Sequence, residues 1–391
     1  MKKNLLSLIM LCCGISAAAQ HSTIDLSGQW CLSLDPDSTG ISKGFLTTLS
    51  NDIVVLPGTT DTNKKGIKND KKDETTHLSR HFSYFGKAWY LRTIDVPASW
   101  KSKNINLFLE RTKPTTVYVD GVEVGKCDDI SVPQLHDLTG KLTPGRHVLA
   151  IMVDNGNSVP KQLLGSSHAY TEDTQTNWNG IIGKMYLEAK ESPVIIKRLL
   201  THSHAAENSV DVEITLCGNL KKKYSISTAI TGKNGYASQQ SFLNEGNSKK
   251  LVNADGTTTL RYKIHLGSDA RKWSEFSPQN LLTLNVRIEC EGKSDEKATT
   301  FGLCDFRAEN SHFIVNGNKT FLRGKHDACV FPLTGHVAMN YDEWYRYLSI
   351  CKQYGINHVR FHSWCPPEAC FDAADDLGIY LQPELPIWGG F

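Results

Sequence analysis

The sequence lacks the features that mark membrane-spanning and nucleic-acid-binding proteins. Beyond the N-terminus it has no run of about 18 apolar residues, which is the length that a helix needs to cross a bilayer. Lysine and arginine total 43 against 41 acidic residues, and Asp70 interrupts the densest basic stretch, residues 64–72. We therefore expect no membrane span in the mature protein and no nucleic acid among its partners.

The cysteines form no disulfide or metal-binding framework. Eleven are present, and two of them lie in the N-terminal apolar segment, which leaves an odd number for the mature chain. Cys365 and Cys370 are not spaced as a C-x-x-C pair, and cysteines of this kind are commonly small buried hydrophobic residues. The sequence also has no H-E-x-x-H, G-x-S-x-G or EF-hand motif. We expect no metal and no cofactor.

The N-terminus is typical of an export signal. A lysine pair precedes an apolar stretch at residues 5–13, and Ala17–Ala19 offers a small-residue cleavage site. We therefore assign residues 1–19 to a signal peptide that is cleaved near Ala19, and we expect a periplasmic or secreted protein. The alternative is a lipid on one of the two cysteines of this stretch, although the small residues that normally precede such a cysteine are missing.

The 391 residues are enough for several domains, and 40 % hydrophobic with 21 % charged residues is an ordinary globular composition. From residue 20 to 190 short alternating segments are separated by turns, for example at 89–97 and 105–110. Asp120-Gly121 lies between two β-branched runs and predicts a tight hairpin with positive φ. Many short strands at this spacing predict a β-sandwich.

Residues 191–304 continue with strands and loops rich in glycine, asparagine, serine and lysine. The expected strands are at 210–216, 224–230, 258–266 and 282–288. A segment of this length and pattern predicts one immunoglobulin-like sandwich, although the Cys…Trp…Cys spacing of antibody domains is absent. We expect it to act as a spacer that fixes the first domain against the third.

The periodicity changes after residue 305. We expect strands at Thr320–Arg323, Ile356–Phe361 and Ile379–Gln382, and helices at Asp342–Tyr354 and Glu368–Leu377. Alternation of strand and helix predicts the opening of a parallel α/β fold.

Four motifs occur in the order found in glycoside hydrolase family 2. They are W-Y-x-R at 89–92, V-x-V-D-G-x-x-V-G at 117–125, D-L-T-x-x-L-x-P-G-x-H-x-L-x-I-x-V-D-N at 137–155, and N-W-N-G-I-I-G-x-M-Y-L-E at 177–188. Residues 357–381 then resemble the first signature region of that family, the β-galactosidase, β-glucuronidase and β-mannosidase group.

The resemblance implies a multidomain, mostly β protein. It consists of a jelly-roll β-sandwich at 20–190, an immunoglobulin-like β-sandwich at 191–304, and the first strands of an incomplete (β/α)8 TIM barrel at 305–391.

The resemblance also places candidate substrate contacts at the carboxyl ends of the barrel strands, which face the active site of such a barrel. His326 and Asp327 follow the first strand and bond either sugar hydroxyls or neighbouring backbone. Arg360 occupies the arginine position of the signature; it braces the active site or forms a structural salt bridge to a strand-end carboxylate. Glu384 follows the third strand. We expect it to be a supporting residue that hydrogen-bonds Arg360 or a sugar hydroxyl, and not a catalytic residue.

The turn after the second strand departs from the family pattern, in which two small residues and H-Y-P follow the arginine. Here the histidine, His362, comes one position earlier and the proline one later. His362 and Trp364 remain candidate substrate contacts, because an aromatic face packs against a pyranose ring. Asp173 lies where the first domain of the family sends a loop toward the barrel.

The resemblance implies a retaining enzyme with two catalytic glutamates near later barrel strands, the acid/base in an Asn-Glu pair. Residues 305–391 contain no Asn-Glu pair, so we expect the catalytic residues to be missing and this chain alone to be inactive. The expected function is that of the N-terminal part of a secreted exo-glycosidase acting on oligo- or polysaccharide glycans. The full-length form could be a homo-oligomer. The alternative is a non-catalytic carbohydrate-binding protein whose jelly roll binds sugar.

Overall fold

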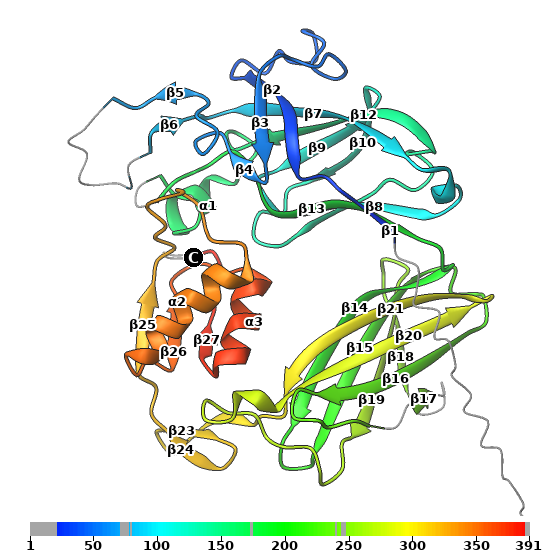
Figure 1. Cartoon of the computed structure of the whole chain (residues 1–391), viewed down its shortest axis with the longest axis vertical. Coiled ribbons are helices and arrows are strands. Elements are labelled where there is room, and N and C mark those ends of the chain that lie inside the picture. The colour runs from blue at the N-terminus through cyan, green and yellow to red at the C-terminus, as the bar shows by residue number, and fades with distance from the viewer. Residues whose placement is uncertain are drawn as a thin grey trace, which may run out of the picture.

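A computed structural model describes residues 22–70, 78, 80–172, 175–238, 241–243 and 248–387. The expected signal peptide and Asp173 lie outside the described residues. Two β-sandwiches and a smaller α/β part make up the fold, and the α/β part contacts a different sandwich at each end (Figure 1). Of the helices in the described ranges, none has both the length and the hydropathy to cross a membrane.

The first sandwich consists of two antiparallel sheets that share one core. One sheet has the order β1 (Ser22–Asp25), β13 (Gly180–Lys190), β8 (Asn104–Thr112), β11 (Gln134–Asp137), with β4 (Gly58–Thr59) beside β13. The other has the order β10 (Val122–Cys127), β9 (Thr115–Val119), β12 (Gly145–Asp154), β7 (Lys87–Val96), β2 (Gly28–Asp35), β3 (Ile53–Leu56). Beside them lie the short pair β5 (Ile67–Lys68) and β6 (Phe82–Ser83), and the short helix α1 (Lys161–Ser166).

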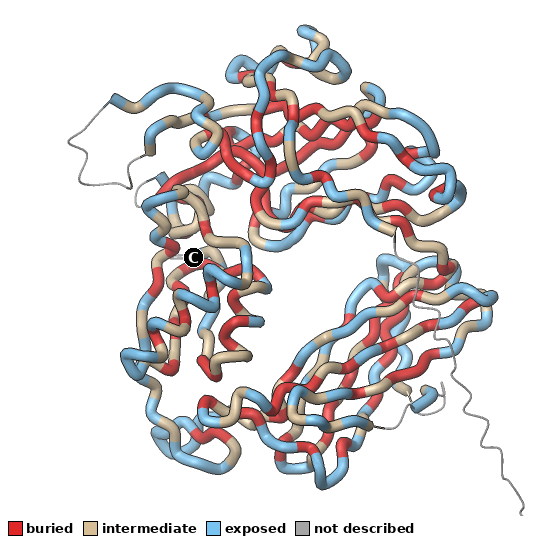
Figure 2. Tube along the Cα trace, viewed as in Figure 1, coloured by how far each residue is buried: buried red, intermediate tan, exposed pale blue. Residues whose placement is uncertain are grey.

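Alternation along the strands builds the core of this sandwich. In β8, Ile105, Leu107 and Leu109 are buried between the sheets, while Asn106 and Phe108, which alternate with them, are partly exposed. The expected hairpin is confirmed, since Asp120 and Gly121 join β9 to β10 with φ of 50° and 81°. Figure 2 shows how buried positions follow the inner faces of the sheets.

The second sandwich also has two antiparallel sheets. Their orders are β14 (Val194–His204), β15 (Ser209–Gly218), β19 (Thr258–His265), β18 (Lys249–Val252), and β17 (Ser241–Leu243), β16 (Tyr224–Gly232), β20 (Leu281–Cys290), β21 (Lys293–Gly302). In β15 the alternating residues Val210, Val212, Ile214 and Leu216 are all buried in its core. The four strands expected from sequence here are therefore confirmed to within about two residues at each end.

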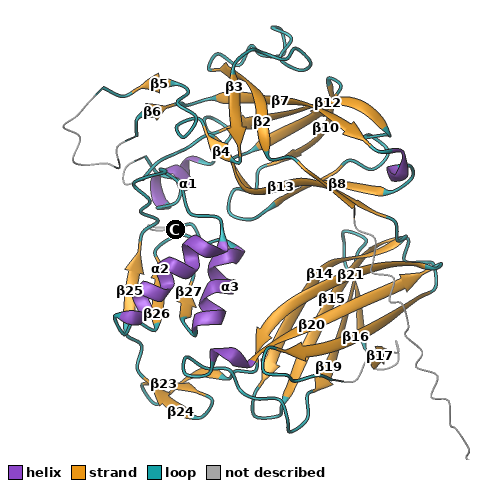
Figure 3. Ribbon diagram, in the orientation of Figure 1, coloured by secondary structure: helices purple, strands orange, loops and turns teal. Residues whose placement is uncertain are grey.

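The α/β part begins with a small antiparallel sheet of β22 (Phe306–Glu309), β23 (His312–Val315) and β24 (Asn318–Thr320). A parallel sheet follows, with β25 (Gly324–Asp327), β26 (His358–Phe361) and β27 (Tyr380–Gln382) in chain order. The helices α2 (Tyr341–Gln353) and α3 (Glu368–Leu377) connect these strands (Figure 3). Both helices were expected from the sequence and are confirmed.

The first parallel strand was placed wrongly. We expected it at Thr320–Arg323, but Thr320 ends β24 and pairs with Phe313 in the antiparallel sheet. The parallel strand starts at Gly324, whose register partner is His358. His326 and Asp327 therefore lie within a strand and do not follow one.

The second sandwich holds the amino ends of the parallel strands. Glu275 accepts hydrogen bonds from Asn357 Nδ2, at 3.1 Å to each carboxylate oxygen, and pairs with Arg323 at 3.3 Å. Trp273 Nε1 donates to the carbonyl of Asp375 at 3.0 Å, at the end of α3. The opposite, carboxyl ends of the strands face the first sandwich.

Candidate functional site

The two faces of the parallel sheet differ in polarity. Val359 and Phe361 are buried against the helices, together with Trp344 of α2. Arg360, which lies between them in β26, and its register partner His326 in β25 are half-buried and exposed on the other face. This second face of the parallel sheet is therefore polar and open to solvent.

An ion pair links the second and third strands at their carboxyl ends. Arg360 Nε donates to Glu384 Oε1 at 2.5 Å, which is one of the arrangements expected for these two residues. The other oxygen of Glu384 accepts the Ser363 N–H at 2.8 Å. Burial alone would raise the pKa of Glu384, but the Ser363 N–H and the Arg360 guanidinium outweigh it and hold the pKa below its usual range.

Ser363 connects this ion pair to the first sandwich. Its side chain is 1 % exposed and its backbone is left-handed, with φ of 54°. Its carbonyl accepts from Ser167 Oγ at 2.9 Å, and its hydroxyl accepts from the His168 N–H at 3.2 Å. Because every polar group of Ser363 has a partner, the turn that bears it is fixed from two sides.

Three histidines lie in a row beside this network. His362 lies between His168 of the first sandwich, with ring centroids 4.6 Å apart, and His326 of β25, at 5.0 Å. Burial and the two neighbouring imidazoles lower the pKa of His168. The sequence drew attention to His326 and His362 but not to His168, which follows the short helix α1 in a polar stretch with no motif.

Asp327 and Trp364 are directed into the protein. Asp327 Oδ1 accepts the Cys329 N–H at 2.9 Å, and Oδ2 contacts Lys325, at 3.2 Å, and the hydroxyl of Tyr347 of α2. Trp364 is 1 % exposed in the core, and its Nε1 donates to the carbonyl of Asp327 at 3.2 Å. The bond between Asp327 and the neighbouring backbone is one of the two arrangements expected for this residue.

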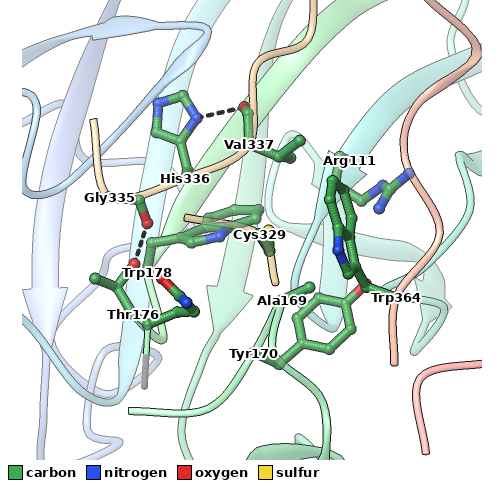
Figure 4. Close-up of a pocket in the computed structure, with 11 residues that line it drawn as sticks. Arg111, Ala169, Tyr170, Thr176, Trp178, Cys329, Gly335, His336, Val337 and Trp364 are labelled. Atoms are coloured by element: carbon green, nitrogen blue, oxygen red, sulfur yellow. Dashed lines mark hydrogen bonds between the residues drawn. The ribbon is translucent and has the colours of Figure 1, made fainter. Parts of the chain in front are cut away.

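The first sandwich and the α/β part enclose a small cavity of about 10 Å³ near these residues (Figure 4). Tyr170 and Trp178 of the first sandwich line it together with Cys329 and Trp364 of the α/β part. Gln175 Nε2 donates to the carbonyl of Ala328 at 2.8 Å, so the two parts are joined by hydrogen bonds as well as by aromatic packing. This cavity is too small for a sugar. It is a gap in the packing between the first sandwich and the α/β part.

A larger cleft of about 930 Å³ lies on the helix side of the α/β part. Its walls are α2, α3, the segment 330–343 and the edge of the first sandwich at 57–62 and 182–184. The strand-end residues Arg360, His362 and Glu384 do not line it. We therefore place the candidate site at the open strand ends and not in this cleft.

The imidazole row does not have the geometry of a metal site. The rings of His168 and His362 are tilted by 50° against each other, and those of His326 and His362 by 53°. Throughout the described ranges, no group of three or more histidine, cysteine, aspartate or glutamate residues could hold a metal ion.

No family model matches the chain. Among curated relatives, a β-glucuronidase of Paenibacillus borealis is 24 % identical over 378 residues, which cover 93 % of this chain and 59 % of the relative. A putative β-glucuronidase of Formosa agariphila is 25 % identical over 389 residues, or 97 % of this chain and 34 % of the relative. A β-galactosidase of Priestia megaterium is 22 % identical over 308 residues, or 75 % of this chain and 28 % of the relative. The chain thus spans from about a quarter to three fifths of the length of these relatives.

Solved structures show the same arrangement. A β-glucuronidase from Ruminococcus gnavus in complex with uronic isofagomine matches 94 % of this chain and 58 % of its own, with a TM-score of 0.70 and 18 % identity. A β-glycosidase from Bacteroides vulgatus matches 93 % of this chain and 44 % of its own, with a TM-score of 0.69 and 21 % identity. In fold, and in sequence over most of its length, the chain is similar to proteins named as β-galactosidases and β-glucuronidases.

Proposed function

We propose that this chain is the N-terminal part of a retaining exo-glycosidase of the glycoside hydrolase family 2 type, which hydrolyses O-glycosidic bonds in oligo- or polysaccharide glycans. The observation that carries the proposal is a polar cluster at the carboxyl ends of parallel strands that follow two β-sandwiches. Similarity to glycosidases over 93–97 % of the chain supports it. In this proposal residues 20–190 are the jelly roll, 191–304 the immunoglobulin-like sandwich, and 305–391 the opening of a (β/α)8 barrel.

His326, Arg360, His362 and Glu384 form one side of the proposed sugar pocket. They lie where the strands of such a barrel end and where its active site is built. Imidazole, guanidinium and carboxylate groups can all hydrogen-bond sugar hydroxyls, and His326, Arg360 and His362 are exposed or half-buried. His168 joins this set from the first sandwich.

The strand-end carboxylates of the described residues are unsuited to act as the catalytic pair. Retaining hydrolysis needs a nucleophile and an acid about 5–5.5 Å apart, and the acid must hold a proton near neutral pH. The pKa of Glu384 is lowered by its partners, and Asp327 is bonded on the helix side of the sheet. We propose that the catalytic glutamates belong to barrel strands other than β25, β26 and β27.

We also propose that the protein is exported to the periplasm or secreted, with residues 1–19 removed near Ala19. The expected charged, apolar and small-residue segments are present in that order. Polysaccharides that cannot enter a cell would be accessible to the enzyme there.

The DNA that follows the codon for Phe391 tests the proposed enzyme. We expect an open frame, continuous or in a neighbouring gene, that encodes further barrel strands with an Asn-Glu pair. The protein containing both parts should hydrolyse aryl β-glycosides and lose this activity when the glutamate of that pair is changed to glutamine. A frame that ends at this codon with nothing related downstream would contradict the proposal.

That contrary outcome would favour a non-catalytic carbohydrate-binding protein. The observation on its side is that both strand-end carboxylates already have protein partners, so the described residues can bind a glycan without cleaving it. Glycan-array binding by the purified chain without any hydrolysis by the extended protein would establish this second function.

A further inference from the structure

A cleft of about 570 Å³ lies between the second sandwich and the helices of the α/β part. This volume is within the range of about 300–1000 Å³ that small-molecule sites have. The strand-end residues Arg360, His362 and Glu384 do not line it. Its walls are Lys233, which follows β16, Pro278 and Gln279 of a short 3-10 helix, Tyr341, Asp342 and Tyr345 of α2, and Asp376 of α3.

Two tyrosine rings form the aromatic part of this cleft. Tyr341 and Tyr345 are one helical turn apart on α2, with ring centroids separated by 5.6 Å and planes inclined by 31°. Tyr345 is 40 % exposed, and Tyr341 is half-buried. A tyrosine offers an apolar ring face and a polar hydroxyl, so it can pack against the C–H face of a sugar ring while the hydroxyl remains available for a hydrogen bond.

Contacts between the two walls hold the polar groups of the cleft in place. The Tyr341 hydroxyl donates to Asp376 Oδ2 at 2.8 Å, and Asp376 Oδ1 forms an ion pair with Lys233. The backbone N–H of Lys233 donates to the carbonyl of Leu281 at 3.2 Å. A carboxylate has further lone pairs and an ammonium has further N–H groups, so both can still bind sugar hydroxyls. Groups that are already ordered cost little entropy on binding.

The charges of the cleft favour a neutral ligand. Lys233, Asp342 and Asp376 are the charged residues that line it, and Lys233 and Asp376 neutralise each other as an ion pair. Asp342 is exposed in the first turn of α2 and leaves the lining with one net negative charge. An anionic sugar would be repelled by this charge, whereas a neutral sugar would not.

We propose that this cleft binds a neutral oligosaccharide, with Tyr341 and Tyr345 in contact with its rings and with Lys233 and Asp376 hydrogen-bonded to its hydroxyls. The inference goes beyond the proposed function, because it adds a second glycan site on the helix side of the α/β part. Such a site would hold a polysaccharide on the protein independently of the sugar at the strand ends.

Titration calorimetry with four hexasaccharides tests this inference. Cellohexaose, xylohexaose and β-1,4-mannohexaose are neutral, and the hexamer of galacturonic acid is anionic. We expect the 391-residue chain to bind at least one of the neutral hexasaccharides and to bind the galacturonate hexamer more weakly, because of the net negative charge of the lining.

Three variants locate the bound glycan. Tyr345→Ala removes the exposed ring and should weaken binding about tenfold, whereas Tyr345→Phe keeps the ring face and should retain most of the affinity. Tyr354→Ala is the matched control, because Tyr354 is 83 % exposed directly after the same helix and does not line the cleft. Binding by this control should equal that of the wild type.

The outcomes separate this inference from the proposed function. Unchanged affinity in Tyr345→Ala, together with loss of binding in Arg360→Gln, would place the glycan at the strand ends; this would overturn the inference and leave the proposed function in place. Binding of none of the neutral hexasaccharides would also overturn it, while hydrolysis by the extended protein would still support the proposed function. Equal or tighter binding of the galacturonate hexamer would contradict the preference for neutral sugars.

Discussion

Lys113 is fully buried in the first sandwich, and among the described residues its ammonium has no hydrogen-bond partner. Its Nζ lies 4.7 Å from the ring centroid of Tyr170 and 4.6 Å from that of Trp178. Burial lowers the pKa of Lys113 to about 7. Cation–π contact with the two rings offsets part of the cost of burying the charge.

Replacement of Lys113 by methionine should stabilise the protein. Methionine keeps the contacts with the two rings and has no charge to bury, so we expect a gain of about 1–4 kcal/mol at pH 7. Because the pKa is lower in the folded chain than in the unfolded chain, the wild type gains stability as pH rises from about 7 toward 10.5. The gain from Lys113→Met should therefore shrink over that range.

Urea unfolding at pH 7 and pH 9.5, followed by tryptophan fluorescence, measures this difference. Lys161→Met is the control, since Lys161 is exposed on α1 and its replacement should change stability by less than about 0.5 kcal/mol. A variant Lys113→Met that is less stable than the wild type at pH 7 would show that the buried charge is stabilising.

The ion pair of the candidate site could be predicted from the sequence because it is local to the sheet. Arg360 and Glu384 end neighbouring parallel strands, and the carboxyl ends of such strands lie at one edge. The position of His168 could not be predicted, because it depends on how two domains contact each other. The burial of Trp364 could not be predicted either, because an aromatic residue next to a strand end is equally suited to the core and to the surface.

At the level of elements, the helices could be predicted from the sequence, because their apolar periodicity and their capping residues are local features. Asn340 begins α2 and accepts the Glu343 N–H at 2.9 Å, and Gly378 ends α3 with φ of 70°. The first parallel strand was missed because Asn318–Thr320 is also extended and polar residues surround both segments. The two segments differ in the strands with which they pair, and the pattern of a single sequence does not show strand pairing.

A comparison of Gly378 with Gly355 measures how tightly the end of α3 packs against the second sandwich. Both have positive φ, of 70° and 77°. A Cβ on Gly378 would lie 2.8 Å from the Glu275 Cα, whereas one on Gly355 would meet nothing within 4 Å.

We expect Gly355→Ala to cost about 1 kcal/mol from backbone strain alone. Gly378→Ala should cost about 2–4 kcal/mol, because the backbone of Glu275 must also move. The midpoints of urea unfolding compare the two variants. Equal losses would indicate that the second sandwich does not press on the end of α3 in solution.

At the scale of the whole molecule, the α/β part depends on both sandwiches. Trp178 and Ile182 of the first sandwich belong to the same hydrophobic cluster as Trp344 and Phe361. At the other end, Glu275 of the second sandwich binds Asn357 ahead of β26. The three parallel strands therefore expose a polar face and keep their apolar side covered.

Trp178→Ala should loosen the α/β part selectively. Truncation of a buried tryptophan costs about 3–5 kcal/mol, and here the lost contacts join two parts of the chain. We expect faster hydrogen exchange in α2 and α3, measured by mass spectrometry. Trp100→Ala removes a tryptophan from the core of the first sandwich alone, so it should leave exchange in these helices unchanged. The same acceleration in both variants would mean that the cluster does not hold the α/β part.

We propose that this chain provides one side of a sugar pocket and that the residues that cleave the glycosidic bond belong to other barrel strands. Incubation of the purified 391-residue chain with aryl β-galactoside, β-glucuronide and β-mannoside measures this directly. We predict no release of the aryl group above the buffer rate. Turnover at ordinary enzyme rates, on the order of 1–1000 s⁻¹, that disappears in Glu384→Gln would contradict the account and make Glu384 catalytic.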